Sequence, residues 1–584
     1  MAAISKWNLA KIKNDCISSY LQCSKRGLLQ SAKWAAELSY SIDNLSSSDT
    51  QEPPTCPQSQ EFALDSDRYM LAKSYFDLKE YDRASHFVSG CNSPEAYFLH
   101  MYARFLSGEK KKLDDAPDSI GPQETDNEYL KTLRGELHKK HKAKLLDAFG
   151  LYLYGAILKK LDLLEEARAM YLLALHANPL IWSAWLELSL LITNKELLAE
   201  IHVPEHWIAP IFSAHTYLEL HMNEEALNIY KDISNAGLER STYLMSQIAL
   251  AHYHNFKEVD QSVEAFNKLQ NVDPYRLEHM DIYSNLLYVK EMRRELAHLA
   301  HHCSNIDKYR EETCCVIGNY YSLRSQHEKA VLYFLRALKL NPNYLSAWTL
   351  MGHEYMELKN TSGAIQAYRK AIEVNRRDYR AWYGLGQTYE ILKMPQYCLY
   401  YYREAQSLRP QDSRMVVALG DAYEKLDRLQ EAKKCFVKAH AVGDVEGQAL
   451  IKLAKLYEKL GEEQQAVAAY TEFINETDQQ GVFIEEQSQA RSQAYRYLAN
   501  FHLTHRNMDE AYYAAQECAK YNETREEGKA LLRQISQLRA VGATDPMGVE
   551  TNDSGSIRTD RVQRAFETSQ GTPNLQPINL TFTP

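Results

Sequence analysis

The sequence predicts an all-α fold, a right-handed solenoid superhelix of stacked helix-turn-helix pairs. The first observation is a residue pattern that recurs seven times between residues 243 and 480 with a constant spacing of 34 residues, a length typical of one helical hairpin in a repeat protein. The second is that small and aromatic residues keep fixed places within each repeat. Because a repeat array has no single core, a chain of 584 residues need not divide into several globular domains.

The fixed columns define the repeat. When each frame is counted from residues 243, 277, 311, 345, 379, 413 and 447, small residues dominate position eight. Small residues allow two helices to approach closely, and the aromatic residues at positions eleven and twenty-four fill the space between neighbouring hairpins. These columns are those of the tetratricopeptide repeat. Position eight is occupied by Leu250, Ser284, Gly318, Gly352, Gly386, Gly420 and Ala454.

The repeats continue less regularly on both sides of the strict array, which gives about 12 to 13 hairpins in all. Polar, Pro-rich stretches interrupt the helical pattern in three places and predict loops or a disordered tail. The predicted segments are an N-terminal helical segment (1–40), a loop (41–60), irregular repeats (61–242) with an inserted loop at about 109–128, the strict array (243–480), C-terminal repeat and capping helices (481–540) and a disordered tail (541–584).

Composition excludes several classes of protein. The net charge of −10 comes without any Lys- and Arg-rich stripe, so we expect no nucleic-acid partner. No apolar run approaches the roughly 18 residues that cross a bilayer, so we expect no membrane span. Ten scattered cysteines show no pairing pattern, which favours reduced thiols in the cytoplasm or nucleus.

Catalytic motifs are absent from the sequence: it has no phosphate-binding loop, no metalloprotease motif and no nucleophile elbow. We therefore expect neither enzymatic activity nor a cofactor. His298, His301, His302 and Cys303 offer imidazole and thiol groups at a spacing that can bind zinc. The simpler interpretation, which we prefer, places them at the end of a repeat's second helix, with no metal.

The first helices of such an array line its concave face, and positions two, five, nine and twelve face into the groove. In the strict array these and the adjacent positions are mostly acidic or amide-bearing, with some apolar contacts. Carboxylates bind guanidinium groups in a forked geometry, so the pattern predicts a groove for an extended, arginine-bearing peptide. The predicted groove residues are Glu312, Asn319, His353, Glu354, Glu357, Arg380, Tyr383, Gln387, Glu390, Asp421 and Glu424.

A carboxylate clamp for acidic chaperone tails would need Lys or Arg at three groove positions and Asn at two. The chain matches this pattern poorly, which disfavours an acidic chaperone tail as the ligand. The five positions are occupied by Cys315, Asn319, Leu350, Arg380 and Gly384. In the C-terminal tail, Thr572 and Thr583 each precede a proline and are possible phosphorylation sites.

Three segments go beyond the generic repeat. LLQSAKWAAEL at the N-terminus, YMLAKSYFDLKEYDRASHFV (69–88) and YFLRALKLNPNYLSAWTLMGHEYMELKN (333–360) closely resemble the subunit 8 family of the anaphase-promoting complex, also called the cell division cycle protein 23 family. The resemblance extends over nearly the whole chain.

The resemblance implies a non-catalytic scaffold of a nuclear and cytoplasmic ubiquitin ligase that acts on mitotic cyclins and securin. It also implies a homodimer joined through the N-terminal repeats, stacking on other tetratricopeptide subunits and the large scaffold subunit, and a C-terminal groove for the C-box segment of the activator. Asn319 and Glu354 are where we expect that peptide's arginine. The alternative is a free-standing co-chaperone or adaptor that recognises a client peptide tail.

Overall fold

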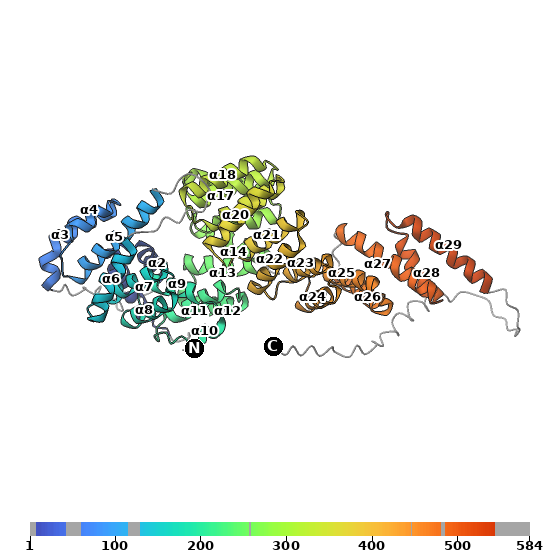
Figure 1. Cartoon of the computed structure of the whole chain (residues 1–584), viewed down its shortest axis with the longest axis horizontal. Coiled ribbons are helices and arrows are strands. Elements are labelled where there is room, and N and C mark those ends of the chain that lie inside the picture. The colour runs from blue at the N-terminus through green and yellow to red at the C-terminus, as the bar shows by residue number, and fades with distance from the viewer. Residues whose placement is uncertain are drawn as a thin grey trace. The chain divides into compact units, whose positions relative to one another are not determined.

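The computed structural model describes residues 7–42, 60–114, 129–255, 259–444, 447–480 and 485–542. All regular secondary structure in these ranges is helical, and consecutive helices pair from α1 onward, which confirms the predicted fold class. The chain forms two compact units, residues 1–410 and residues 411–584. Figure 1 labels the helices of both units.

The first unit contains the helices up to α22. Their bounds are α1 Leu9–Lys25, α2 Leu29–Ser41, α3 Gln60–Asp77, α4 Tyr81–Phe87, α5 Pro94–Asp114, α6 Tyr129–Lys142, α7 Ala148–Lys160, α8 Leu164–Ala177, α9 Trp182–Leu191, α10 Lys195–Glu200, α11 Ile208–Glu219, α12 Asn223–Ile233, η2 Ser234–Leu238, α13 Thr242–His254, α14 Val259–Val272, α15 Met280–Val289, α16 Arg293–Ile306, α17 Glu311–Leu323, α18 His327–Leu340, α19 Leu345–Glu357, α20 Thr361–Val374, α21 Tyr379–Ile391 and α22 Pro395–Leu408.

The second unit continues the same pairing and ends in an unpaired helix. Its helices are α23 Ser413–Lys425, α24 Leu429–Val442, α25 Gln448–Leu460, α26 Glu463–Gln480, α27 Glu485–Thr504, α28 Met508–Cys518 and α29 Arg525–Gly542. In the part of the chain that the structure describes, no helix is both long and apolar enough to span a membrane.

The eighth column of the repeat is the point of closest approach between the two helices of a hairpin. A Cβ atom added to Gly352 in α19 would lie 2.5 Å from the Cε1 atom of Tyr368 in α20. The same holds one repeat earlier, where a Cβ on Gly318 would lie 2.5 Å from Cε1 of Phe334. Tyr368 and Phe334 are fully buried. The small residue and the aromatic ring of one hairpin therefore pack as a matched pair.

The turn between the two helices is equally regular. The residue at position fifteen has a left-handed backbone in consecutive repeats, with φ of 57° at Ser325, 59° at Lys359 and 57° at Lys393. A left-handed residue just beyond a helix end satisfies the last carbonyl groups, as when the amide of Asn360 donates to the Tyr355 carbonyl over 2.8 Å. The hairpin turn thus accepts non-glycine residues at a small conformational cost.

The repeat counted from residue 207, just before the strict array, is longer than 34 residues, and its extra length has a structural cause. Between α12 and α13 the chain forms a short π-helical turn, η2, in which Gly237 has a φ of 115°. Side chains rarely adopt this φ, so a glycine is required here. The extra residues are absorbed in this turn, after which the spacing of 34 begins.

The N-terminal segment forms a helical hairpin of its own, α1 and α2, which packs on the inner helices α9 and α13 (Figure 1). The Trp34 ring of α2 stacks on Trp182 of α9, with ring centroids 4.3 Å apart. Trp207, just before α11, donates from Nε1 to Asp15 of α1 over 3.0 Å. This hairpin and the α5/α6 pair lie outside the 34-residue frame, so the period undercounts the hairpins.

One predicted boundary is wrong. The inserted loop was expected from about residue 109, but α5 remains helical to Asp114. The Nζ atom of Lys111 lies 3.1 Å from an Asp82 carboxylate oxygen and 5.2 Å from the Tyr129 ring centroid, so polar residues extend the helix. The rest of that loop (115–128), most of the loop predicted at 41–60, and residues 543–584 of the predicted tail lie outside the described residues.

We predict that Gly352→Ala destabilises the protein by about 1–3 kcal/mol, because the new methyl group overpacks against the buried Tyr368 ring. The matched control is Gly135→Ala in α6, where nothing lies within 4 Å of the added Cβ and the higher helix propensity of alanine stabilises by roughly 0.8–1 kcal/mol. Denaturant unfolding of both variants measures the difference. Equal stability of the two variants would contradict the ring-on-glycine contact.

Candidate peptide-binding groove

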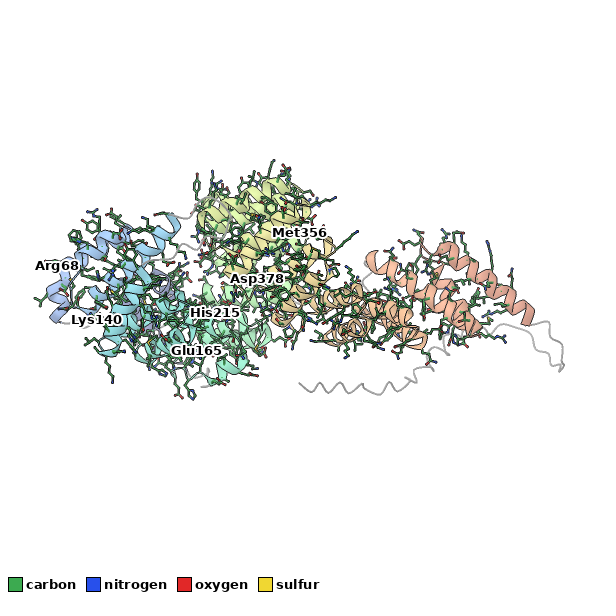
Figure 2. The ribbon with its side chains drawn as sticks, viewed as in Figure 1. Arg68, Lys140, Glu165, His215, Met356 and Asp378 are labelled. Atoms are coloured by element: carbon green, nitrogen blue, oxygen red, sulfur yellow. The ribbon has the colours of Figure 1, made fainter. Side chains whose placement is uncertain are left out.

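The predicted groove in residues 1–410 would be formed by the first helices of consecutive repeats, α15, α17, α19 and α21, each of which contacts the next. α17, α19 and α21 each begin after an extended residue, as at Asp378, whose side chain accepts from the backbone amide of Arg380 over 3.1 Å. Figure 2 labels Met356 on α19 and Asp378 just before α21. Nine of the eleven predicted groove residues lie on these helices, and the other two, Asp421 and Glu424, lie on α23.

Asn319 lies at the centre of a buried amide and hydroxyl cluster. Its side chain is 3% exposed, and its Nδ2 donates to Ser284 Oγ over 2.7 Å and to Asn285 Oδ1 over 2.6 Å. These two bonds fix the orientation of the amide, so its carbonyl oxygen points away from Ser284 and Asn285. An amide oxygen held in this way can accept a hydrogen bond from a guanidinium group.

Glu354 is a buried carboxylate with two fixed donors. The residue is 5% exposed. Its Oε1 accepts from Ser322 Oγ over 2.7 Å, and its Oε2 lies 2.8 Å from Nδ1 of His327. Each carboxylate oxygen can accept a second hydrogen bond. Because a buried negative charge requires compensation, a cationic side chain bound here would be strongly favoured.

Two other predicted residues on this surface are engaged with neighbours. Glu312 of α17 accepts from Arg310 Nε over 3.2 Å and from Arg310 Nη2 over 3.0 Å. His353 of α19 lies with Nδ1 2.8 Å from the Tyr368 hydroxyl. His353 is exposed at the surface of α19, yet the repeats around it desolvate its ring, and together with the Arg380 charge they lower its pKa to about 4. His353 therefore acts in the groove as a neutral imidazole.

The predicted residues on α21 form a tyrosine-rich surface. The Tyr383 ring lies 5.4 Å from the Tyr402 ring of α22, whose hydroxyl donates to Glu390 Oε2 over 2.7 Å. Gln387 is partly exposed beside them. Arg380 contacts a different set of residues, with its Cζ 5.8 Å from the Tyr253 ring centroid of α13.

The predicted list does not form one site. Glu357 is exposed at the last turn of α19. Asp421 and Glu424 belong to residues 411–584, where they accept from Lys452 and Lys459 of the next first helix, α25. Their charges are therefore compensated within that unit. Thr572 and Thr583 lie outside the described residues.

Sequence reasoning missed two residues of the groove. Asn285 occupies position nine of the frame from Leu277, the same groove column as Asn319, so the repeat register could have identified it. His327 is the first residue of α18 and contacts Glu354. No groove column contains it, so the register gave no signal for that residue.

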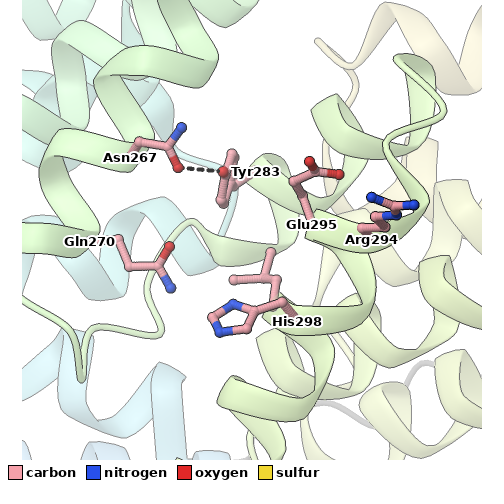
Figure 3. Close-up of a pocket in the computed structure, with 7 residues that line it drawn as sticks. Asn267, Gln270, Tyr283, Arg294, Glu295 and His298 are labelled. Carbon is pink, nitrogen blue, oxygen red and sulfur yellow. Dashed lines mark hydrogen bonds between the residues drawn. The ribbon is translucent and has the colours of Figure 1, made fainter.

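A separate cavity of about 300 Å³ lies between α14, α15 and α16. Figure 3 shows its lining, in which the Tyr283 hydroxyl donates to Asn267 Oδ1 over 2.8 Å. His298 also lines this cavity, and its ring stacks on His302 with centroids 6.2 Å apart. The cavity is lined by Asn267, Gln270, Tyr283, Arg294, Glu295, His298 and Leu299.

The His and Cys cluster considered for zinc has other partners. His302 Nε2 lies 2.7 Å from the Pro274 carbonyl oxygen, and Cys303 is buried, which raises the pKa of its thiol to about 12. The cysteines in the described residues are free thiols. Elsewhere in the described part of the chain, His440, Glu472 and Glu476 gather three potential ligands on α24 and α26, in the geometry of surface ion pairs.

We predict that Arg380→Gln raises the pKa of His353 from about 4 toward the ordinary value of about 6.5, because it removes the charge that opposes protonation. The C–H resonances of selectively labelled histidine measure this pKa by titration. An unchanged pKa in the variant would show that burial alone sets it.

Family models match most of the array. The model described as "Anaphase promoting complex subunit 8 / Cdc23" matches residues 11–249. Tetratricopeptide repeat models match residues 311–344, 352–391, 413–439 and 447–477, which confirms the repeat assignment.

Curated relatives carry the same description. A cell division cycle protein 23 homolog of Bos taurus is 59% identical over 302 residues, which are 51% of this chain and 50% of that protein. The Homo sapiens homolog is 58% identical over the same coverage, so the match spans about half the length of these relatives. The anaphase-promoting complex subunit 8 of Dictyostelium discoideum is 37% identical over 412 residues, 61% of this chain and 69% of that protein.

A solved structure, titled as that of the anaphase-promoting complex hetero-tetramer Cut9-Hcn1, is similar in fold. Its chain superimposes with a TM-score of 0.52 at 17% sequence identity, over 81% of this chain and 91% of that one. At this identity the likeness concerns the solenoid fold only.

Proposed function

Since the chain belongs to the anaphase-promoting complex subunit 8 / Cdc23 family, we propose that it is a non-catalytic scaffold subunit of the anaphase-promoting complex/cyclosome, a ubiquitin ligase. In this function it supports the ubiquitination of mitotic cyclins and securin in the nucleus and cytoplasm. The stacked helical pairs support the proposal, because such an array offers long surfaces for neighbouring subunits. The partners are other tetratricopeptide subunits and the large scaffold subunit.

The groove suits the C-box segment of the activator, a short arginine-bearing peptide. The observation that carries this assignment is the buried Glu354 carboxylate, with donors from Ser322 and His327 on one side and the Asn319 cluster on the neighbouring helix α17. A guanidinium group presents several donors in a planar fork, which fits a carboxylate and an amide oxygen together. The ring of Tyr383 offers an apolar contact for an adjacent peptide side chain.

Homodimerisation through the N-terminal repeats belongs to the same proposal. In the first unit, the N-terminal hairpin packs against α9 and α13. This packing holds the first repeats together with α7 and α9 as one body. Arg26, in the turn after α1, reaches Asp147 before α7 over 3.1 Å. A rigid N-terminal body is a suitable base for an isologous interface.

We predict that Glu354→Gln weakens binding of an activator C-box peptide by about tenfold or more, because the neutral amide loses a charge-assisted hydrogen bond. Fluorescence anisotropy with the labelled peptide measures the affinity, and circular dichroism checks the helix content. The matched control is Glu373→Gln on α20, an exposed glutamate that accepts from Lys370. Equal affinity in both variants would reject the Glu354 site.

When citrulline replaces arginine in the peptide, the wild type and Glu354→Gln should bind it with nearly the same affinity. If that peptide still distinguishes the two proteins, the arginine does not contact Glu354.

We predict that the full-length protein sediments as a dimer and that a chain beginning at residue 148 sediments as a monomer in analytical ultracentrifugation. The N-terminal repeats would carry the interface. The control is a chain that ends at residue 542, which retains all described helices and should remain a dimer. A dimer formed by residues 148–584 would place the interface elsewhere.

A further inference from the structure

Segments more than 150 residues apart in the sequence meet on the inner side of the first unit. Arg377, in the turn before α21, donates from Nη2 to the Leu190 carbonyl over 2.9 Å. Arg409, just after α22, donates from Nη2 to the His254 carbonyl over 3.0 Å. Both carbonyls lie in the last turn of a helix, α9 and α13, where backbone acceptors lack helical partners and the helix dipole favours a cation. The two contacts close one turn of the coil.

Arg380 completes what we call the arginine cluster: Arg377, Arg380 and Arg409. The Arg409 Cζ lies 4.4 Å from the Tyr379 ring centroid, and the Arg380 Cζ lies 6.0 Å from the same centroid. Two of the three guanidinium groups therefore lie against Tyr379, and the contacts of Arg377 and Arg409 bring the cluster to the ends of α9 and α13.

Imidazole groups face the cluster from the α11–α12 turn and from α13, while the carboxylates of Asp378 and Asp281 act on Arg380 through their charges. The His221 ring meets the Tyr379 ring edge-on at 5.7 Å and lies 5.9 Å from the His254 ring. Burial, followed by the charges of Arg409 and Arg380, lowers the pKa of His221 to about 4. Burial and the charge of Arg380 also lower the pKa of His254 well below its usual range. Both shifts favour the neutral imidazole near pH 7.

The cluster has donors that no described residue uses. The Nη1 atom of Arg377 and the Nε atom of Arg380 are buried without a hydrogen-bond acceptor in the described part of the chain. Asp378 Oδ1 lies 3.6 Å from Arg380 Nε, beyond hydrogen-bond distance, and that oxygen already accepts from the Arg380 backbone amide. Burial lowers the pKa of Arg377, which Glu219 opposes only through space. Buried cationic donors without acceptors are costly, so an anionic ligand would stabilise this arrangement.

We propose that the arginine cluster is an oxyanion-binding site that takes a phosphate group, either as the free ion or on a phosphorylated side chain. Guanidinium groups bind phosphate oxygens through paired N–H donors, and the unused donors of Arg377 and Arg380 supply them. The site is distinct from the peptide groove at Glu354, which takes a cation, and it does not depend on the proposed function.

The test uses the full-length protein and inorganic phosphate. We expect phosphate to raise the melting temperature in a saturable manner, relative to chloride at equal ionic strength, because a ligand that binds only the folded state stabilises it. Isothermal titration calorimetry then gives the affinity. Arg377→Gln and Arg380→Gln should each weaken phosphate binding by about tenfold or more, since each removes a charge-assisted donor.

The matched control is Arg376→Gln. Arg376 is exposed and adjacent to Arg377, so this variant removes the same charge from the same turn and should bind phosphate as the wild type does. The proposal would be overturned if phosphate stabilised the wild type and the three variants equally. It would also be overturned if phosphate stabilised the wild type no more than chloride does.

Arg377→Gln also removes the contact to Leu190, so it alone could lose affinity through local unfolding. Arg380 does not contact Leu190, so Arg380→Gln removes a phosphate donor without removing that contact. If Arg380→Gln binds phosphate with wild-type affinity, the proposal is overturned. A peptide with one phosphothreonine, compared with free phosphate, identifies the source: tighter binding of the peptide points to a phosphorylated side chain, and tighter binding of phosphate to the free ion.

Discussion

The hairpins that begin at Glu311, Leu345, Tyr379 and Ser413 each depend on the contact between an aromatic ring on the second helix and a glycine on the first. Tyr368 shows how far this contact reaches, because its ring lies against Gly352 of its own repeat and Gly384 of the next, where added Cβ atoms would each be 2.5 Å from a ring carbon. One side chain therefore sets both the angle within a hairpin and the spacing to its neighbour. Since this spacing repeats, the first helices lie side by side and form a continuous inner surface.

That inner surface explains why polar residues can be buried in a structure without a globular core. Close packing of α15 and α17 brings Asn319 to Ser284 and Asn285, and close packing of α17 and α19 brings Ser322 to Glu354. Such a network is costly when it is only partly satisfied and strongly orienting when complete. The amide and carboxylate of the groove are consequently held in place before any ligand arrives, which limits the ordering cost of binding.

The sequence predicted the repeat architecture and much of the groove because both follow a local register. Gly318 and Asn319, for example, can be assigned to the packing and groove faces from their positions alone. What the register cannot show is contact between distant segments. Arg380 occupies a groove column, yet its neighbours are Tyr253 and Tyr379 because the coil completes a turn there. The extension of α5 to Asp114 was not predicted for another reason. Its polar residues form surface ion pairs, such as Lys111 with Asp82, and leave no apolar pattern in the sequence.

The closure of a turn also gives the inner surface two kinds of charge. Where neighbouring first helices meet, carboxylate and amide groups such as Glu354 and Asn319 collect, and where one turn meets the next, arginines cap the carbonyl ends of α9 and α13. The difference has a physical origin. Helix ends in this coil expose backbone acceptors, which attract guanidinium groups. The sides of helices expose only side chains, so their charge depends on the residues in the groove columns. The solenoid geometry thus separates a surface suited to cationic peptides from one suited to anions within one unit of the chain.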